Sequence, residues 1–555
     1  MTGPSRASEA AAMHGVVATA FPAATEAGLE MLRAGGNAVD AAVAAAWALA
    51  VCEPSGSGLG GSTLMLIHLP AGRTVVVGGQ SCAPAAVSRK TVSRRQQQKG
   101  YRACTTPTTA ATLGCAQARY GLLPLGRVME PAVRLAEEGY PVTRLQRRQQ
   151  KQCLADLSAQ PAARRLFLKG GRPFRAGDCF RQPELANTLK RLARAGVEDF
   201  HRGRIARDIA DDMAENGGLL TREDLAGAAA PIRASDPITI RYRGREIASA
   251  PQPAGGAQLL LAMKVLEQFS PGELSGQADD WYAIVAEVIY AVFRNRDLFA
   301  APPGRLTPAF YDWLLGDEHA ARIACAVRTP AGVPALRRAP EGPGETTHLS
   351  AADAQGCIVA LTQSIQSVYG AKVAHGKLGF LYNNYLCTSP RGRHPYQLAG
   401  RCIPRSNAAP TLVFGKKRCQ EPFFGKPETP MIDSRKKVPD TFFSPRPLLA
   451  LGAAGSRRIT SSILQVLSCR LDRGLTLAEA VAHPRIHATL GRTVHVEKPA
   501  ASAPLLARLE KRFRAVEVRG ARSFYMGAVQ AVWIGEDGTL AGAADPRRDG
   551  TAGAT

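Results

Sequence analysis

The stretch Gly344-Glu345-Thr346-Thr347-His348-Leu349-Ser350 decides how this chain is interpreted. A Gly- and Pro-rich approach at 340–344 leads into two threonines, and the alternating residues that follow predict a buried strand. Turn residues at 353–356 and the apolar run 358–362 predict a second strand. A threonine at a new N-terminus carries its own base in its α-amine, so the stretch fits a chain that cuts itself before Thr346. Taken alone, the pattern favours two ordinary strand residues over a nucleophile.

The composition is that of a large folded protein with a strongly basic surface. The 555 residues suffice for one large or two ordinary cores, and 45% hydrophobic with 21% charged residues is typical of globular proteins. The net charge of +24 is compatible with nucleic acid, anionic membrane surfaces or acidic substrates as partners. The basic residues are dispersed and are not interleaved with aromatics as on a single-strand binding platform. We therefore expect no nucleic-acid function and interpret the charge as a solvated surface.

The cysteines and the N-terminus bear on metals and compartment. The 12 cysteines include no CxxC pair, so we expect no metal site, no redox motif and no cofactor. Free, mostly buried thiols fit a reducing compartment. The segment Met1–His14 has no apolar core of a signal peptide, and Ala38–Cys52, the most apolar stretch, is too short to span a bilayer. These features predict a cytoplasmic protein without a membrane span, or a periplasmic one if the start is truncated.

The glycine-rich stretch 56–61 formally contains the GxGxxG pattern of dinucleotide-binding proteins. That pattern requires a strand before it and a helix after it. Here an Ala/Val-rich helical stretch ending at Val51 precedes, and the strand-like 63–68 follows. We therefore reject dinucleotide binding and expect the glycines to let the backbone approach another segment or a ligand closely.

Several motifs occur in one order along nearly the whole chain, from about residue 14 to the end. They are 25–32, 35–44, 53–54 with 58–61, 83–85 with Arg89, 129–132 with 135–136 and 139–140, 182–189, 217–225, the threonine stretch, 452–456 and 544–547. This order resembles that of the gamma-glutamyltransferase family. Members of that family are N-terminal-nucleophile enzymes made as a proenzyme.

The resemblance implies an architecture and a processing event. It implies an α+β fold, a four-layer αββα sandwich of the N-terminal-nucleophile hydrolase type. The Glu345–Thr346 bond would be cut, leaving a large subunit, 1–345, associated with a small catalytic subunit, 346–555. Helical patterns that dominate before about residue 325, and strand patterns after 346, are consistent with this. The implied activity is that of an autoprocessing N-terminal-threonine amide hydrolase or acyltransferase acting on a small amide substrate that bears a carboxylate.

The resemblance also assigns catalytic roles. Thr346 would attack the Glu345 carbonyl during processing and a substrate amide afterwards, with its α-amine, of pKa about 7.7–8.0, as base. Ser364 falls where the family has a threonine that holds this amine. Gln366, which is implied to bind substrate, falls where the family commonly has asparagine. Both keep the hydrogen-bonding capacity of the residues that they replace. Without the resemblance, these two positions would be interpreted as the polar face of an ordinary strand.

Gly455 and Ser456 match a glycine-rich turn whose two backbone N–H groups stabilise the tetrahedral intermediate. Ser456 replaces the second glycine, and N–H donation survives this change unless the turn requires a positive φ there. The alternative is a plain turn ahead of a helix at 459–467, whose N-terminus would in any case favour negative charge.

The positions implied to bind substrate depart from the family. Arg89 matches an arginine that clamps the substrate carboxylate, and Ser406-Asn407 falls where transpeptidases have two serines on the same group. Tyr385 replaces an expected glutamine, and Thr388 replaces an expected aspartate that would hold the α-ammonium, a contact of roughly 1.5–3 kcal/mol. A glutathione-type γ-glutamyl substrate therefore competes with another carboxylate-bearing amide, as in the acylase-like branches of the family.

Two further expectations remain. The segment 415–447 is basic and Pro-rich where relatives usually have a short hairpin turn, so it is either a surface flap or contact arm, or a disordered insertion. A catalytically inactive scaffold that binds polyanions is the alternative from another functional class. The presence of Thr346, Ser364 and Gly455 argues against that alternative.

Overall fold

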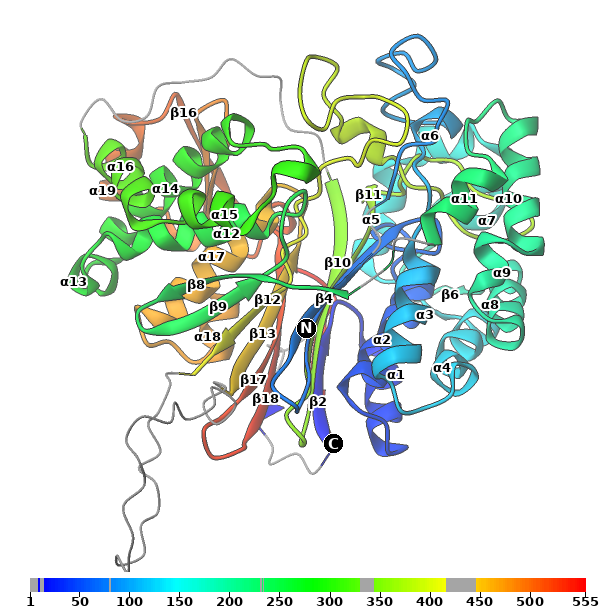
Figure 1. The fold of residues 1–555 in the computed structure, drawn as a ribbon, viewed down its shortest axis with the longest axis horizontal. Coiled ribbons are helices and arrows are strands. Elements are labelled where there is room, and N and C mark those ends of the chain that lie inside the picture. Colours follow the sequence, from blue (N-terminus) through cyan, green and yellow to red (C-terminus); the bar gives the residue numbers. More distant parts are fainter. Residues whose placement is uncertain are drawn as a thin grey trace, which may run out of the picture.

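The computed structural model describes residues 8–9, 14–78, 81–229, 232, 234–329, 344–415 and 446–555. Two sheets pack face to face at its centre, and helices cover the outer face of each sheet (Figure 1). This is the predicted four-layer αββα sandwich of the α+β class. The predicted insertion 415–447 lies, apart from its ends, outside the described residues.

Each of the two central sheets has seven strands. The first sheet has the order β1 (Ser8–Glu9), β18 (Leu540–Ala544), β17 (Ala528–Ile534), β13 (Pro447–Ala454), β12 (Thr411–Phe414), β9 (Arg245–Ser249) and β8 (Ile238–Tyr242). The second has the order β19 (Thr551–Ala554), β2 (Gly15–Thr19), β10 (Gly344–Asp353), β11 (Ile358–Ser367), β3 (Ser62–His68), β4 (Thr74–Gly78) and β7 (Ala234–Ser235). Each sheet therefore combines strands from both sides of the Glu345–Thr346 bond.

The helices divide between the two outer layers (Figure 1). The layer over the second sheet contains α1 (Pro22–Arg33), α2 (Ala38–Cys52), α3 (Thr109–Tyr120), α4 (Leu125–Glu138), α5 (Arg144–Gln152), α6 (Leu154–Ser158), α7 (Pro161–Phe167), α8 (Pro183–Ala195), α9 (Glu198–His201), α10 (Arg204–Glu215) and α11 (Arg222–Ala229). The layer over the first sheet contains α12 (Gly256–Glu267), α13 (Pro271–Ser275), α14 (Ala278–Leu298), α15 (Pro308–Leu314), α16 (Asp317–Arg328), α17 (Arg458–Leu471), α18 (Leu477–Ala482) and α19 (Ala503–Glu510). Two small sheets lie outside this core. One contains β14 (Ile486–Ala488), β15 (Thr493–Glu497) and β16 (Ala515–Arg519), and the other contains β5 (Tyr140–Pro141) and β6 (Cys179–Phe180).

Helix α2 shows how small residues build the core. All of its residues are buried, and Asn37 with Asp40 forms a capping box at its start. Asp40 also accepts hydrogen bonds from the backbone of Leu122 and Leu123, at 3.0–3.1 Å, so it ties α2 to the start of α4. Within the described part of the chain, no helix is long and apolar enough to cross a bilayer. The apolar stretch 38–52 is a core helix, as predicted.

The glycine-rich stretch 56–61 connects α2 to β3, the reverse of the dinucleotide-binding order. A Cβ on Gly60 would lie 2.1 Å from the backbone oxygen of Leu381, and one on Gly61 would lie 2.3 Å from that of Ser364. Side chains do not tolerate such distances, so both positions require glycine for close backbone approach. The sequence-based interpretation of this loop is confirmed.

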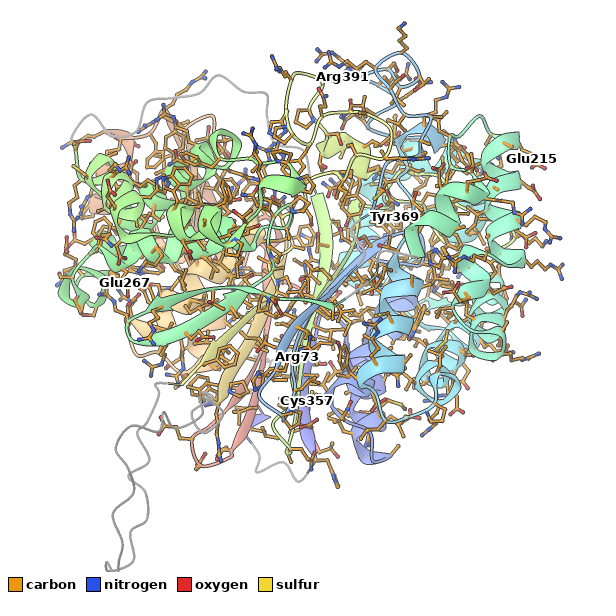
Figure 2. All side chains as sticks on the ribbon, viewed as in Figure 1. Arg73, Glu215, Glu267, Cys357, Tyr369 and Arg391 are labelled. Atoms are coloured by element: carbon orange, nitrogen blue, oxygen red, sulfur yellow. The ribbon has the colours of Figure 1, made fainter. Side chains whose placement is uncertain are left out.

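Side chains fill the space between the layers, while charged ones such as Glu215 lie at the outer surface (Figure 2). The face between the two sheets is lined by small and aliphatic residues such as Ala18, Leu412 and Val532. His348 is a polar exception: its ring nitrogens lie 2.9 Å from Thr362 Oγ1 and 3.1 Å from Ser350 Oγ. Burial lowers its pKa to about 3, so the ring stays neutral and acts as a structural hydrogen-bonding group.

Gly452 makes room for that ring, which gives a test of the sheet packing. A Cβ on Gly452 would lie 2.2 Å from Cε1 of His348. We expect Gly452→Ala to destabilise the fold by about 1–3 kcal/mol through overpacking, seen as a lower Tm. The control is Gly272→Ala in α13, where an added Cβ meets no atom within 4 Å. Equal melting temperatures for the two variants would contradict the close approach.

Candidate active site

Thr346 lies at an irregularity in β10. The pairing of β10 with β11 shifts register between Glu345 and Thr347, so Thr346 is displaced from the regular ladder. Its hydroxyl donates to the backbone oxygen of Glu345 at 2.7 Å and lies 3.2 Å from Ser364 Oγ. The predicted nucleophile therefore sits beside the carbonyl of the bond that it is predicted to break.

Ser364 holds this arrangement from β11. Its hydroxyl donates to the Glu345 backbone oxygen at 2.9 Å and accepts the backbone N–H of Gln366 at 2.8 Å. Gln366 adopts a φ of 82° and pairs with Glu345 across the ladder. The structure thus brings Ser364 to the predicted nucleophile, and Gln366 contributes through its backbone N–H.

The predicted oxyanion turn lies against the residue that precedes Glu345. A Cβ on Gly344 would fall 2.2 Å from that of Ser456, although more than a hundred positions separate them in sequence. Gly455 has a φ of 125° and Ser456 a φ of 56°, so the turn does require a positive φ at the serine. Among the described residues, neither backbone N–H has a hydrogen-bond acceptor. The turn can offer two donors beside the Glu345–Thr346 bond.

A small cavity adjoins Ser364. Tyr385, in the short helix η3 (Tyr385–Thr388), places its hydroxyl 3.4 Å from the Ser364 backbone oxygen. Ser406 reaches the same cavity from the irregular segment that precedes β12. The residues that line the cavity are Ser62, Thr63, Leu64, Ser81, Thr362, Ser364, Tyr385, Pro404, Ser406 and Ala408. Their polar groups are mostly hydroxyls, and none carries a charge.

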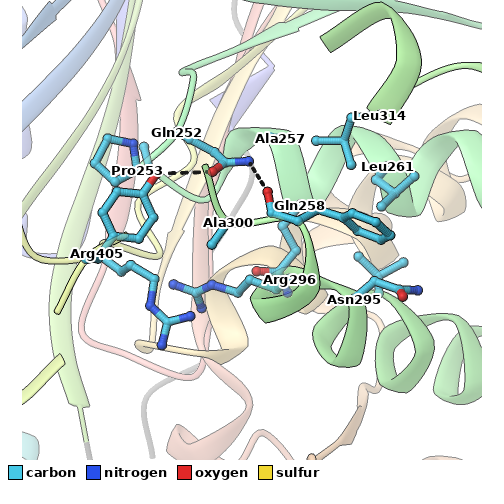
Figure 3. Close-up of a pocket in the computed structure, with 14 residues that line it drawn as sticks. Gln252, Pro253, Ala257, Gln258, Leu261, Asn295, Arg296, Ala300, Leu314 and Arg405 are labelled. Atoms are coloured by element: carbon cyan, nitrogen blue, oxygen red, sulfur yellow. Dashed lines mark hydrogen bonds between the residues drawn. The ribbon is translucent and has the colours of Figure 1, made fainter. Parts of the chain in front are cut away.

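Ser406 and its neighbour Asn407 face different surroundings. Pro404, Ser406 and Ala408 line the cavity beside Ser364, whereas Arg405 lines a second pocket, drawn in Figure 3. Arg296, which also lines that second pocket, donates to Asn407 Oδ1. The two residues predicted to share one substrate carboxylate therefore do not share one cavity in this structure.

The second pocket has a mixed lining (Figure 3). Gln252 accepts from the Tyr396 hydroxyl at 3.1 Å and donates to the Phe299 backbone oxygen at 3.3 Å, which fixes one wall. Arg296 and Arg405 supply positive charge, and Leu261 with Leu314 closes the apolar side.

Arg89 and Thr388 are placed less centrally. Arg89 is exposed, and its guanidinium donates to Gln397 Oε1 at 3.3 Å. It does not line the cavity beside Ser364. The Thr388 hydroxyl lies 2.9 Å from the backbone oxygen of Tyr385 and 3.0 Å from that of Arg405, so it ties η3 to the 404–408 segment.

Three residues that sequence reasoning missed surround the Glu345 side chain. Arg548 forms an ion pair with Glu345 Oε1 and donates to Glu53 Oε1 at 2.8 Å. Gln149 Nε2 lies 3.4 Å from Glu345 Oε2. Burial raises the pKa of Glu53 to about 7 and raises that of Glu345, while Arg548 opposes both shifts. The signals in the sequence were the adjacency of Arg548 to the 544–547 motif and the position of Glu53 in the 53–54 motif.

A buried charge network positions Arg548. Asp545 accepts the backbone N–H groups of Val529 at 2.8 Å and Arg547 at 3.0 Å. Its other partners are the guanidinium groups of Arg485 at 2.6 Å and Arg547 at 3.1 Å. These bonds fix the turn between β18 and β19 from which Arg548 reaches Glu345.

The chain is similar to known proteins along most of its length. The sequence matches the family described as Gamma-glutamyltranspeptidase over residues 24–431 and 441–555. It is 32% identical to a glutathione hydrolase proenzyme of Escherichia coli (strain K12), covering 97% of this chain and 91% of that protein. It is also 32% identical to an acylase ACY 1 proenzyme of Pseudomonas sp. (strain V22), covering 97% and 93%. The crystal structure of cephalosporin acylase from Bacillus halodurans superposes with a TM-score of 0.84 at 27% identity, covering 100% of this chain and 98% of that one.

The fold, with these neighbours, is that of the N-terminal-nucleophile hydrolases. Within that class, the chain belongs to the gamma-glutamyltranspeptidase family. The predictions of the family, of the fold and of an enzyme are confirmed. The roles of individual site residues stay predictions.

The left-handed turn offers a test of the predicted oxyanion donors. Because glycine adopts a φ of 56° without steric cost and keeps the N–H, we expect Ser456→Gly to self-cleave at the wild-type rate. Valine is a poor fit at this φ, so Ser456→Val should distort the turn. We expect its cleavage rate to fall by about 100-fold, the loss typical of a missing oxyanion-hole donor. Denaturing electrophoresis over time measures both rates. A Gly variant as slow as the Val variant would show that the serine hydroxyl matters instead.

Proposed function

We propose that this protein is an autoprocessing amide hydrolase or acyltransferase whose nucleophile is Thr346. The observation that carries the proposal is the position of the Thr346 hydroxyl, 2.7 Å from the Glu345 backbone oxygen and 3.2 Å from Ser364 Oγ. A hydroxyl in that place can attack the preceding carbonyl, exchange the peptide bond for an ester, and leave a free N-terminal threonine after hydrolysis.

The same groups then serve turnover. The new α-amine of Thr346, with a pKa of about 7.7–8.0, takes the hydroxyl proton as the oxygen attacks a substrate amide. The N–H groups of Gly455 and Ser456 stabilise the oxyanion, and Ser364 orients the nucleophile. Water or an amine removes the acyl group from the ester and restores the threonine.

Cleavage before Thr346 would leave two interlocked subunits. In the second sheet, β10 of the small subunit pairs with β2 of the large one, and β11 pairs with β3. In the first sheet, β12 of the small subunit pairs with β9 of the large one. The backbone hydrogen bonds of both sheets therefore hold residues 1–345 and 346–555 together.

The first candidate substrate is a γ-glutamyl amide of the glutathione type. Membership of the gamma-glutamyltranspeptidase family and the likeness to a glutathione hydrolase proenzyme support it. Arg89 would clamp the substrate carboxylate with Ser406 and Asn407. Because these residues do not line one cavity, this role requires that they move or that the carboxylate bridges two surfaces.

An acylase acting on another carboxylate-bearing amide is the second candidate. Thr388, where an aspartate would hold the α-ammonium, instead bonds to backbone oxygens, and no residue lining the cavity beside Ser364 carries a carboxylate. An α-ammonium group would therefore meet no opposite charge there. The likeness to an acylase proenzyme is as high as that to the glutathione hydrolase.

The nucleophile assignment is tested by two substitutions at one position. We expect Thr346→Ala to remain a single chain and to turn over no substrate, because it lacks the attacking oxygen. Thr346→Ser keeps a hydroxyl and should still cleave, with the serine as the N-terminus of the smaller fragment. Electrophoresis with N-terminal sequencing measures the outcome. Cleavage of the alanine variant at wild-type rate would refute the assignment.

The rates of hydrolysis of two anilide substrates distinguish the two substrate candidates. If the site has lost its ammonium partner, glutaryl-anilide should be hydrolysed at least as well as γ-glutamyl-anilide, compared by kcat/KM. Thr388→Asp should then shift preference toward the γ-glutamyl compound by about 10- to 150-fold, the equivalent of a charge-assisted hydrogen bond. A strict γ-glutamyl preference in the wild-type protein would show that another group holds the ammonium.

A further inference from the structure

Two buried carboxyl groups flank one buried guanidinium at the Glu345–Thr346 bond. Arg548 pairs with Glu345 on one side and lies 2.8 Å from Glu53 on the other. The exposed fraction is 0% for the Glu345 side chain, 1% for that of Arg548 and 9% for that of Glu53. The nucleophile assignment gives this group of charges no role.

The charges of this group do not cancel when both carboxyls are ionised. One guanidinium then faces two carboxylates, which is costly where water cannot screen them. One shared proton restores neutrality. Burial raises the pKa of Glu53 to about 7 and raises that of Glu345, so burial favours protonation of the carboxyl pair.

Among the other titratable groups around the pair, three stay neutral and one, Arg458, opposes protonation of Glu345. Burial raises the pKa values of Cys52, Tyr140 and Cys153, so these groups stay neutral. Arg458 adds one more positive charge that favours an ionised Glu345. The remaining neighbour, Gln149, carries no charge and approaches Glu345 Oε2 at 3.4 Å.

The Glu345 side chain also touches the nitrogen that must leave. The backbone N–H of Thr346 donates to Glu345 Oε1 at 3.2 Å. A Cβ on Gly56 would lie 3.1 Å from Glu345 Cγ, so the glycine-rich loop closes over this side chain and restricts its rotation. The carboxyl is therefore held against the Thr346 nitrogen, while the Thr346 hydroxyl contacts the Glu345 backbone oxygen at 2.7 Å.

We propose that the Glu345 carboxyl is the acid that protonates the Thr346 nitrogen during self-cleavage, with Arg548 and Glu53 as positioning residues. This inference rests on the proposed function. An amide nitrogen is not basic, but it gains a lone pair once its carbonyl carbon becomes tetrahedral. A carboxyl that already contacts this nitrogen is in place to donate at that moment.

The step balances without any outside reagent. The bond from Thr346 Oγ1 to the Glu345 carbonyl carbon forms, and the bond from that carbon to the Thr346 nitrogen breaks. The nitrogen gains one proton from the carboxyl pair, and the hydroxyl loses one, which returns to the pair through water. The pair ends with the protons that it had at the start, and water then hydrolyses the ester.

The test is the pH dependence of self-cleavage in freshly translated precursor, followed by denaturing electrophoresis. Because the acid must carry a proton, the wild-type rate should fall about tenfold per pH unit once the pH exceeds the raised pKa of Glu345. Glu345→Gln keeps the shape and the acceptor for the Thr346 N–H but has no proton to donate. We expect its rate to fall about 100-fold or more and the decline at high pH to disappear.

Two further variants separate acid chemistry from structural support. Glu345→Asp retains an ionisable carboxyl and should recover part of the rate together with the pH dependence. Glu53→Gln leaves one carboxyl beside Arg548, so that carboxyl ionises more readily and the decline should move to lower pH. Glu479→Gln, at an exposed position of α18, is the matched control and should behave as wild type.

The outcomes are distinct. If Glu345→Gln cleaves at the wild-type rate with the wild-type pH profile, the inference is wrong. If Glu345→Gln does not fold, as judged by circular dichroism, the Glu53→Gln profile decides instead, and an unshifted profile overturns the inference. Cleavage of Thr346→Ala would overturn the proposed function itself, independently of both results.

Discussion

The pairing of β10 with its two neighbours is the constraint on which the rest of the structure depends. Strand β10 lies between β2 and β11 and carries Glu345 and Thr346 at its beginning. Regular pairing holds from Thr347 to Ala352, whereas the register shifts at Thr346. A strand anchored along most of its length can therefore present one irregular residue at its end in a defined position.

Close approach between backbones completes this end of the strand. Gly61 lets β3 meet the backbone of Ser364, and Gly344 lets the turn at Ser456 lie against β10. Neither contact adds catalytic groups by itself. Together they bring a hydroxyl from β11 and a turn from the end of β13 to one peptide bond, although these segments are far apart in the chain. The close approaches at Gly61 and Gly344 thus allow the site to assemble.

The sequence predicted the fold and the family better than it predicted the surroundings of the central residues. Motif order pointed to the family, and hydrophobic patterns placed α2, β3 and the strand that begins near Thr346. The positive φ of Ser456 was left open, because a serine in a glycine-rich turn does not reveal its backbone angle. The separation of Ser406 from Asn407 was not predicted, since it depends on which way consecutive side chains point. Arg548 was missed because only folding brings the last residues of the chain beside Glu53 and Glu345.

That last contact has a consequence for the order of events. Arg548 comes from the turn between β18 and β19, near the end of the chain, and Asp545 and Arg547 fix that turn through buried ion pairs. Without it, the Glu345 carboxyl would lose the guanidinium with which it forms an ion pair. If Glu345 acts as proposed, the proton donor is held in position by Arg548 only after the C-terminal strands have joined their sheets. Cleavage would then follow folding of the whole chain, so that the chain is cut only once the strands of both parts already hold each other.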